Sequence, residues 1–262
     1  MNILDKILTD KKKEVALKKS VVPVSQLEAS VLFGQETISL AEKLKKSTTG
    51  IIAEHKRRSP SKAVINQNHN VQDVVLGYEK AGVCGISVLT DGKYFGGSLD
   101  DLIIARAASK TALLRKEFII DKYQLLEAKA HGADVILLIA AVLTKEEIKN
   151  LSTFAKSLGL EVLLEVHNKE ELDKSLMPSL DMLGVNNRNL KTFEINLDIS
   201  KTLAEHIPDD FVKVSESGIS TIEAIKTLQT FGYQGFLIGE NFMRTDNPGK
   251  SAEEFIKIME NK

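Results

Sequence analysis

The sequence predicts an α/β fold, a (β/α)8 TIM barrel with an N-terminal helical extension. Three observations favour this fold. Eight short apolar segments follow one another from residue 50 onward, amphipathic stretches separate them, and the chain has 262 residues, close to the length of about 250 that such a barrel takes. Strictly alternating strands and helices require a parallel sheet whose faces the helices cover.

The predicted strands are short apolar runs that end in polar or small residues. In chain order they are GIIAEHK, CGISVLT, ALLRKEF, DVILLIA, EVLLEVH, DMLGVNN, FVKVSES and GFLIGE. Stretches such as DKYQLLEAKAHGA carry apolar residues three and four positions apart, which predicts amphipathic helices, several of them ending at a glycine such as Gly132 or Gly159. The alternative is an open doubly wound sheet, which usually carries a G-x-G-x-x-G motif that this sequence lacks.

Residues 1–46 are predicted to form the helical extension, and residues 47–262 the catalytic barrel, together one structural unit. Apolar residues at positions 3, 4, 7 and 8 form a stripe at helical spacing. The lysine-rich stretch from Lys11 to Lys19 is expected to be a solvated helix face rather than an arm that binds nucleic acid. Neither a proline-rich linker nor a low-complexity segment divides residues 50–262.

The composition favours a soluble cytoplasmic protein. Basic and acidic side chains nearly balance, at 35 and 36, so no basic field predicts a nucleic-acid partner. The single cysteine, Cys84, cannot form an intrachain disulfide. No apolar run approaches the length of a membrane span, and Asp5 and Lys6 interrupt any signal-peptide core, so we expect no membrane partner.

Polar side chains follow the apolar residues at the ends of several predicted strands. In a barrel the active site lies at the carboxyl ends of the strands, and side chains two positions apart share a face. Four strands therefore direct polar groups toward one mouth; the residues on these faces are Glu54, Lys56, Lys116, Phe118, Glu165, Asn186 and Arg188. Charges at a single strand end can simply meet solvent, but four coincident cases favour a pocket.

The last two predicted strands each have a glycine just past their apolar run. Gly218 and Gly239 would let backbone N–H groups approach a ligand closely, before helical patterns that begin near Thr221 and Phe242. Barrels of this kind commonly bind phosphate at these two loops and a helix N-terminus. The alternative is that both glycines only make tight turns. Glu240 favours this alternative, because its carboxylate would repel phosphate unless it points away.

With these motifs identified, the chain resembles the indole-3-glycerol phosphate synthase family over nearly its whole length. The resemblance lies in seven ordered blocks: IAEHKRRSPSK, ISVLTDGKYFGGSLDDL, LLRKEFIID, LGLEVLLEVHNKEEL, LGVNNRNLKTF, VSESGI and LIGENFMR. It implies a (β/α)8 barrel with a helical extension. It also implies that 1-(2-carboxyphenylamino)-1-deoxyribulose 5-phosphate, a phosphorylated small molecule, is closed to an indole with loss of carbon dioxide and water, without metal or organic cofactor.

The resemblance also implies roles for the polar residues. Lys116 matches the general acid, whose pKa would need to be lowered toward neutrality. Lys56 matches a second lysine that holds anionic groups and shares in proton transfer, with Glu54 as its partner carboxylate, and Glu165 matches the glutamate that removes or returns a proton during dehydration. Asn186 and Arg188 match a hydrogen-bonding pair. Substrate, phosphate and rim positions correspond to Ser59, Phe118, Glu216, Ser217, Gly218, Gly239 and Glu240.

The sequence argues against two rival functions. A phosphoribosylanthranilate isomerase type of barrel uses a cysteine after the first strand, where this chain has Glu-His-Lys. A barrel that only binds partner enzymes would have lost the lysine and glutamate set, which is intact here. We expect the chain to act as a monomer, with a weak homodimer as the alternative.

Overall fold

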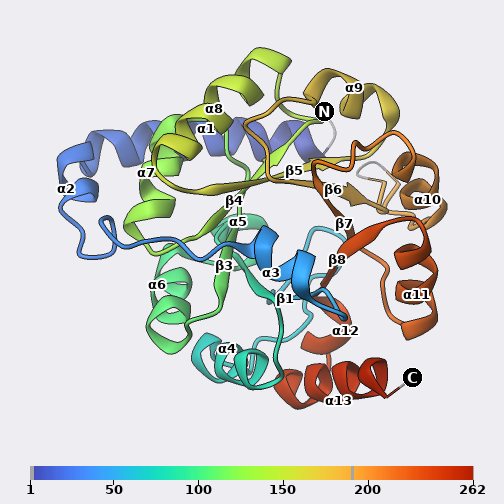
Figure 1. Ribbon diagram of the computed structural model, residues 1–262. Helices are drawn as coiled ribbons and strands as arrows, with labels where there is room; N and C mark the ends of the chain where they lie inside the picture. Colours follow the sequence, from blue (N-terminus) through green and yellow to red (C-terminus); the bar gives the residue numbers. More distant parts are fainter. Residues whose placement is uncertain (1–2, 190–191, 262) are drawn as a thin grey trace.

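The computed structural model describes residues 3–189 and 192–261, and these contain a closed barrel of eight parallel strands in the order β1-β2-β3-β4-β5-β6-β7-β8 (Figure 1). The predicted fold class and the predicted strands, in chain order, are confirmed. Their bounds are β1 Ile51–His55, β2 Gly85–Leu89, β3 Ala112–Lys116, β4 Val135–Ile139, β5 Glu161–Val166, β6 Met182–Asn186, β7 Val212–Glu216 and β8 Tyr233–Ile238.

Helices follow the strands and cover the outside of the barrel (Figure 1). They are α4 Val71–Lys80, α5 Gly92–Phe95, α6 Leu99–Ala108, α7 Lys122–Ala130, α8 Lys145–Ser157, α9 Lys169–Ser175, α10 Asp198–Ala204, α11 Ile222–Thr230, α12 Glu240–Met243 and α13 Pro248–Glu260. Capping boxes at Asp121 and Thr144 start α7 and α8. Gly132 and Gly159 end them with φ of 84° and 74°, the left-handed conformation that was predicted.

Alternate residues of each strand fill the barrel interior, in the predicted register. The inner cluster includes Ile52, Leu114, Leu163 and Val214, all fully buried. Each of these residues lies two positions before a polar residue at the carboxyl end of its strand, so the polar side chains face the mouth. The pairing of neighbouring strands, such as Asn186 beside Glu216, places these ends at one level.

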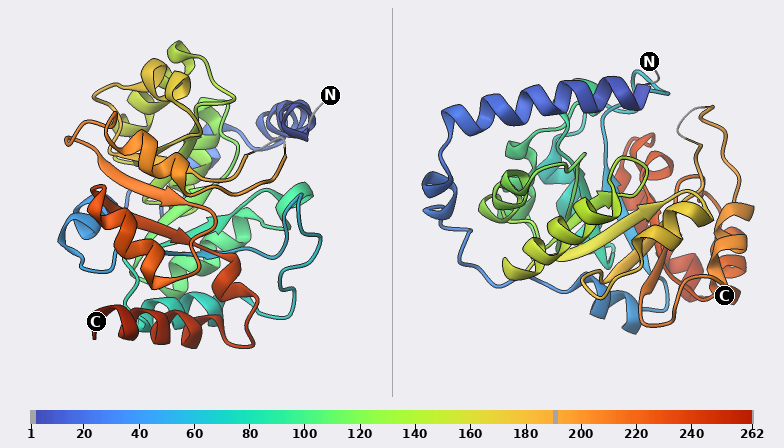
Figure 2. Two further views of the ribbon diagram at one scale, coloured as in Figure 1. Left: turned by 90° about the vertical axis from the view of Figure 1, so that its right-hand side faces the viewer. Right: turned by 90° about the horizontal axis from the view of Figure 1, so that it is seen from above.

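The N-terminal helices lie at both ends of the barrel. Figure 2 shows α1 (Ile3–Val21) and α3 (Leu40–Lys46) at opposite ends, with the strands between them. Leu40 and Leu44 of α3 belong to the inner cluster and close the amino end. Gly85 leaves the room that this helix needs, because a Cβ there would lie 2.6 Å from Leu40 Cδ1. The short α2 (Val24–Glu28) lies between α1 and α3 in the chain. The division at residue 46 stays a prediction.

One expectation for the extension was wrong. Lys11 is not part of a solvated face: its side chain is 2 % exposed, because it meets three carboxylates beneath α1. Lys12, Lys13 and Lys19 are exposed, as predicted. Within residues 3–189 and 192–261, none of the helices has the length and apolar character that a membrane span requires.

Candidate active site

A pocket of about 600 Å³ opens at the carboxyl end of the barrel. Every residue that the sequence predicted for the site lines it: Glu54, Lys56, Ser59, Lys116, Phe118, Glu165, Asn186, Arg188, Glu216, Ser217, Gly218, Gly239 and Glu240. These residues come from six strands, β1, β3, β5, β6, β7 and β8, or from the segments that follow them. The structure therefore brings the predicted site together, whereas the individual roles stay predictions.

The centre of the pocket is an ammonium group among carboxylates. Lys116 Nζ contacts Glu216 Oε2 directly and lies 3.4 Å from Glu165 Oε2. A second pair, Lys56 Nζ and Glu54 Oε1, lies 2.5 Å apart. Both glutamates around Lys116 are almost fully buried, so these charges interact with little screening by water.

The pKa of Lys116 is raised, so the expectation of a pKa lowered toward neutrality is wrong for the free protein. Burial alone would lower it, but the carboxylates of Glu216, Glu165 and Glu54 outweigh burial. The opposite applies to Glu216: burial raises its pKa to about 7, Glu165 adds to the rise, and Lys116 opposes it. One ammonium cannot fully neutralise both Glu165 and Glu216, and Glu216 is the carboxylate that takes up a proton near neutral pH.

Glu165 stays ionised beside this pair. Burial raises the pKa of Glu165, but Lys116 and His167 lower it by more than burial raises it, so the net shift is downward. His167 Nε2 lies 3.4 Å from Glu165 Oε1, and its Nδ1 lies 3.1 Å from Glu171 Oε2. Sequence reasoning missed His167, because it follows Glu165 by two positions without any recognisable ligand spacing. Two buried glutamates with opposite shifts are typical of acid–base sites.

Two glycines make room for the buried carboxylates. A Cβ at Gly184 would lie 2.4 Å from Glu216 Oε1, and one at Gly239 would lie 2.3 Å from Glu54 Oε1. Within the described part of the chain, Glu216 Oε1 has no hydrogen-bond partner although it is buried. Gly239 therefore allows the site to assemble, in addition to any role toward a ligand.

The loop after β7 has an unusual backbone. Ser217 and Gly218 both adopt positive φ, 67° and 76°, and a non-glycine residue in this region is strained. α11 begins shortly afterwards, with the Thr221 hydroxyl accepting a hydrogen bond from Ala224 N. The positive φ of Gly218 fits both alternatives raised by the sequence, a tight turn and a loop that binds phosphate. Strain at a pocket-lining serine favours a functional role for this loop.

Glu240 is neutralised by a residue that sequence reasoning did not identify. Lys62 Nζ, in the loop after β1, donates to Glu240 Oε1 at 2.8 Å. Both residues line the pocket. The pairing weakens the objection that a carboxylate beside phosphate must be repulsive, because a cation lies next to it.

The opposite side of the pocket is apolar. The rings of Phe95 and Phe118 lie 6.0 Å apart between centroids, and Ile3, Leu4 and Ile7 of α1 also line the pocket. Only Phe118 was predicted. The helical stripe at the N-terminus was a signal for the isoleucines and leucine, but nothing local linked it to the strand ends.

Asn186 and Arg188 lie together, as predicted. Asn186 Oδ1 accepts a hydrogen bond from Arg188 N at 3.0 Å, and the Asn186 side chain also helps to lower the pKa of Glu165. The motif that contains them extends to Leu190 and Lys191, which lie outside the described residues. Among the residues that are described, no three His, Cys, Asp or Glu side chains are grouped to hold a metal ion.

Solved structures with similar folds agree with the barrel. Thiamine phosphate pyrophosphorylase from Pyrococcus furiosus matches with a TM-score of 0.60 at 17% identity, over 85% of this chain and 98% of that one. KGPDC from Streptococcus mutans also matches with a TM-score of 0.60, at 13% identity, over 81% and 97% of the two chains. At such low identity these similarities show the fold alone.

Sequence relatives are far more specific. An indole-3-glycerol phosphate synthase from Bacteroides thetaiotaomicron is 46% identical over 259 residues, 99% of each chain. One from Campylobacter jejuni is 40% identical over 97% of this chain and 100% of its own length. The sequence model of the indole-3-glycerol phosphate synthase family matches residues 4–255. The chain therefore belongs to the indole-3-glycerol phosphate synthase family.

Proposed function

We propose that this chain closes 1-(2-carboxyphenylamino)-1-deoxyribulose 5-phosphate to indole-3-glycerol phosphate, with loss of carbon dioxide and water. The observation that carries the proposal is the position of Lys116, whose ammonium lies between Glu165 and Glu216 and faces the pocket. Family membership supplies the reaction, and this cluster supplies groups that can donate and accept the protons it needs.

The topology suggests how the substrate lies across the mouth. In a closed barrel of this strand order, β3 and β7 are on opposite sides. The aryl ring would lie against Phe95 and Phe118 near β2 and β3, and the phosphate against Ser217, Gly218 and Gly239 near β7 and β8. The reacting carbons between these two ends would then lie over Lys116 and Glu216.

The first step forms a carbon–carbon bond. The ring carbon that bears the carboxylate attacks the sugar ketone, and the ketone oxygen gains negative charge. The Lys116 ammonium donates a proton to that oxygen, which thereby becomes a hydroxyl group. Its raised pKa does not prevent this, because an alkoxide is about as basic as hydroxide, the conjugate base of water with its pKa of 15.7.

Loss of carbon dioxide then restores the aromatic ring, and loss of water completes the indole. In the last step the hydroxyl takes a proton from the Lys56 ammonium and leaves as water, and the proton on the carbon next to the nitrogen passes to a carboxylate base. Glu165, held ionised by Lys116 and His167, serves as the base that removes a proton. Lys56, paired with Glu54, holds the substrate's anionic groups.

The direct test is a fluorescence assay of the purified protein with the carboxyphenylamino sugar phosphate and no added metal. The chain contains no tryptophan, so indole fluorescence from the product appears against a low protein background. Formation of indole-3-glycerol phosphate is the expected result. Absence of product from a folded sample would overturn the proposal.

We also propose that the enzyme acts as a monomer in the cytoplasm, without nucleic-acid partners. The support is that Lys and Arg number 35 against 36 Asp and Glu, so the chain has no basic field that favours nucleic acid. Sedimentation at micromolar concentration should give the mass of a single chain, and a stable dimer would contradict this.

A further inference from the structure

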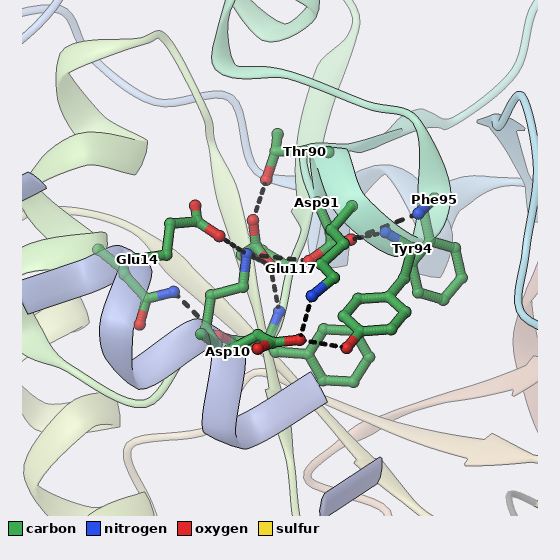
Figure 3. A network of polar contacts seen from close by, with 12 residues as sticks. Asp10, Glu14, Thr90, Asp91, Tyr94, Phe95 and Glu117 are labelled. Atoms are coloured by element: carbon green, nitrogen blue, oxygen red, sulfur yellow. Dashed lines mark hydrogen bonds and ion pairs between the residues drawn. The ribbon is translucent and has the colours of Figure 1, made fainter. Parts of the chain in front are cut away.

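Lys11 of α1 forms a buried cluster with acidic residues of its own helix and of the loops after β2 and β3. Figure 3 shows three of these residues, Glu14, Asp91 and Glu117, close to one another. Its Nζ lies 2.8 Å from Glu14 Oε2, 3.0 Å from Asp91 Oδ2 and 3.0 Å from Glu117 Oε1. We refer to Lys11, Glu14, Asp91 and Glu117 as the Lys11 cluster. Asp91 and Glu117 are buried, at 2 % and 1 % side-chain exposure. None of these residues belongs to the chemistry proposed above.

The two buried carboxylates also hold the backbone of the aromatic side of the pocket. Asp91 Oδ1 accepts hydrogen bonds from Tyr94 N at 2.7 Å and Phe95 N at 3.3 Å. Glu117 Oε1 accepts one from Phe118 N at 2.8 Å. Phe95 and Phe118 are thus each tied through their own backbone N–H to a carboxylate that contacts Lys11.

Further contacts join the same helix to the same loop. Asp10 Oδ2 accepts hydrogen bonds from Lys93 Nζ at 2.7 Å and from the Tyr94 hydroxyl. The Glu117 oxygen that does not contact Lys11, Oε2, accepts a hydrogen bond from Thr90 Oγ1 at 2.8 Å. Consecutive residues of α1 therefore hold the segment after β2 from two points (Figure 3).

The charge of Lys11 is what makes this arrangement stable. Burial would lower its pKa, but Glu117, Asp91 and Glu14 raise it well above its usual range, so the side chain stays an ammonium. Without it, Asp91 and Glu117 would be a buried pair of carboxylates that, among the described residues, keeps only Arg115 as an ion-pair partner, with Nη2 3.8 Å from Glu117 Oε2. Such a pair relaxes by moving apart or by taking up a proton, and either change alters the carboxylates that hold Phe95 and Phe118.

We infer that Lys11 is a positioning residue that sets the Phe95–Phe118 wall and, through it, the binding of the substrate's aromatic ring. The inference rests on the proposed function, because it assigns the aryl group of that substrate to this wall. Lys11 acts through Asp91 and Glu117 and does not touch the reacting atoms.

The test compares Lys11→Met with a matched control on the same helix, Lys18→Met. Lys18 also bridges α1 to the barrel, at 3.0 Å from Glu14 Oε1 and 3.5 Å from Glu127 Oε1, but neither Lys18 nor Glu127 lines the pocket. For each variant we would measure kcat, KM and Tm, together with the Kd of indole-3-glycerol phosphate and of inorganic phosphate, at a temperature well below Tm.

Lys11→Met should raise KM and the Kd of indole-3-glycerol phosphate by about tenfold or more, since misplacement of a binding group by about 1 Å can cost up to about a hundredfold. Its kcat should change by less than about threefold, and the Kd of inorganic phosphate should not change. Lys11→Arg, which keeps the charge, should recover most of the affinity. Lys18→Met should lower Tm without changing KM.

An unchanged KM in Lys11→Met, or an equal rise in Lys18→Met, would overturn the inference, because the effect would then be absent or due to docking of α1 alone. If Lys11→Met does not fold, Lys11→Met combined with Glu117→Gln removes one of the unbalanced carboxylates, and the same rise in KM is expected. Failure of the wild type to turn over substrate would instead overturn the proposed function, so the two failures are distinguishable.

Discussion

Replacing Glu216 by glutamine should make the protein more stable at alkaline pH and, at the same time, less active. Burial and the carboxylate of Glu165 raise the pKa of Glu216 to about 7, against the opposing effect of Lys116, from an ordinary value of 4.5. The folded state thus holds this proton more tightly than the unfolded state. The corresponding stability is fully present below pH 4.5 and is lost as the pH rises through 7.

The size of the effect follows from the shift in pKa. Each pKa unit corresponds to about 1.36 kcal/mol, so the ionised Glu216 costs the folded state about 3 kcal/mol at pH 8 and less than about 1 kcal/mol at pH 5. Glutamine keeps the shape of the neutral acid and cannot ionise. The free energy of unfolding of Glu216→Gln should therefore exceed that of the wild type by less than about 1 kcal/mol at pH 5 and by about 3 kcal/mol at pH 8.

The assay is urea unfolding of both proteins at several pH values, followed by far-ultraviolet circular dichroism because the chain has no tryptophan. Glu147→Gln is the matched control: hydrogen bonds from Thr144 lower the pKa of Glu147, so this variant should lose stability relative to the wild type as the pH rises. Turnover of Glu216→Gln should fall, because Lys116 loses the carboxylate it contacts. A stability difference that does not depend on pH would refute the reasoning.

Two further variants test the walls of the pocket. Gly239→Ala should lower kcat/KM by about tenfold or more, since its Cβ would lie 2.3 Å from Glu54 Oε1 and displace that carboxylate from Lys56; steady-state kinetics that match the wild type would contradict this. Lys62→Met should raise KM by about two- to fivefold, the size of a partly exposed ion pair, because Glu240 then faces the phosphate without its cation. Adding Glu240→Gln should restore KM, and a double variant no better than the single one would refute the pairing argument.

The strands and the register of the site could be predicted because both follow from local pattern. Apolar residues at every second position of a strand must face one side, so the polar residue two places beyond Leu114 or Leu163 had to reach the mouth. The pocket contains Lys116 and Glu165 for that reason. Parallel topology then brings strand ends together at one edge without any knowledge of loop structure.

What could not be predicted depends on contacts between distant segments. Lys11 lies in a run of lysines that looks solvated, and its burial arises only when α1 meets Asp91 and Glu117. The direction of the Lys116 shift also escaped prediction, because it depends on how many carboxylates surround one ammonium. Glu216 comes from the opposite side of the barrel, and its contact with Lys116 exists only once the barrel closes.

The most direct test of the central claim is single-turnover formation of indole-3-glycerol phosphate by Lys116→Met beside the wild type. Loss of the proton donor should slow product formation by at least about a hundredfold, while the Kd of the product changes by only a few fold. Lys116→Arg keeps the charge beside Glu216 but does not release a proton, and it should be equally slow. Product formation by either variant within tenfold of the wild-type rate would show that Lys116 does not carry the reaction.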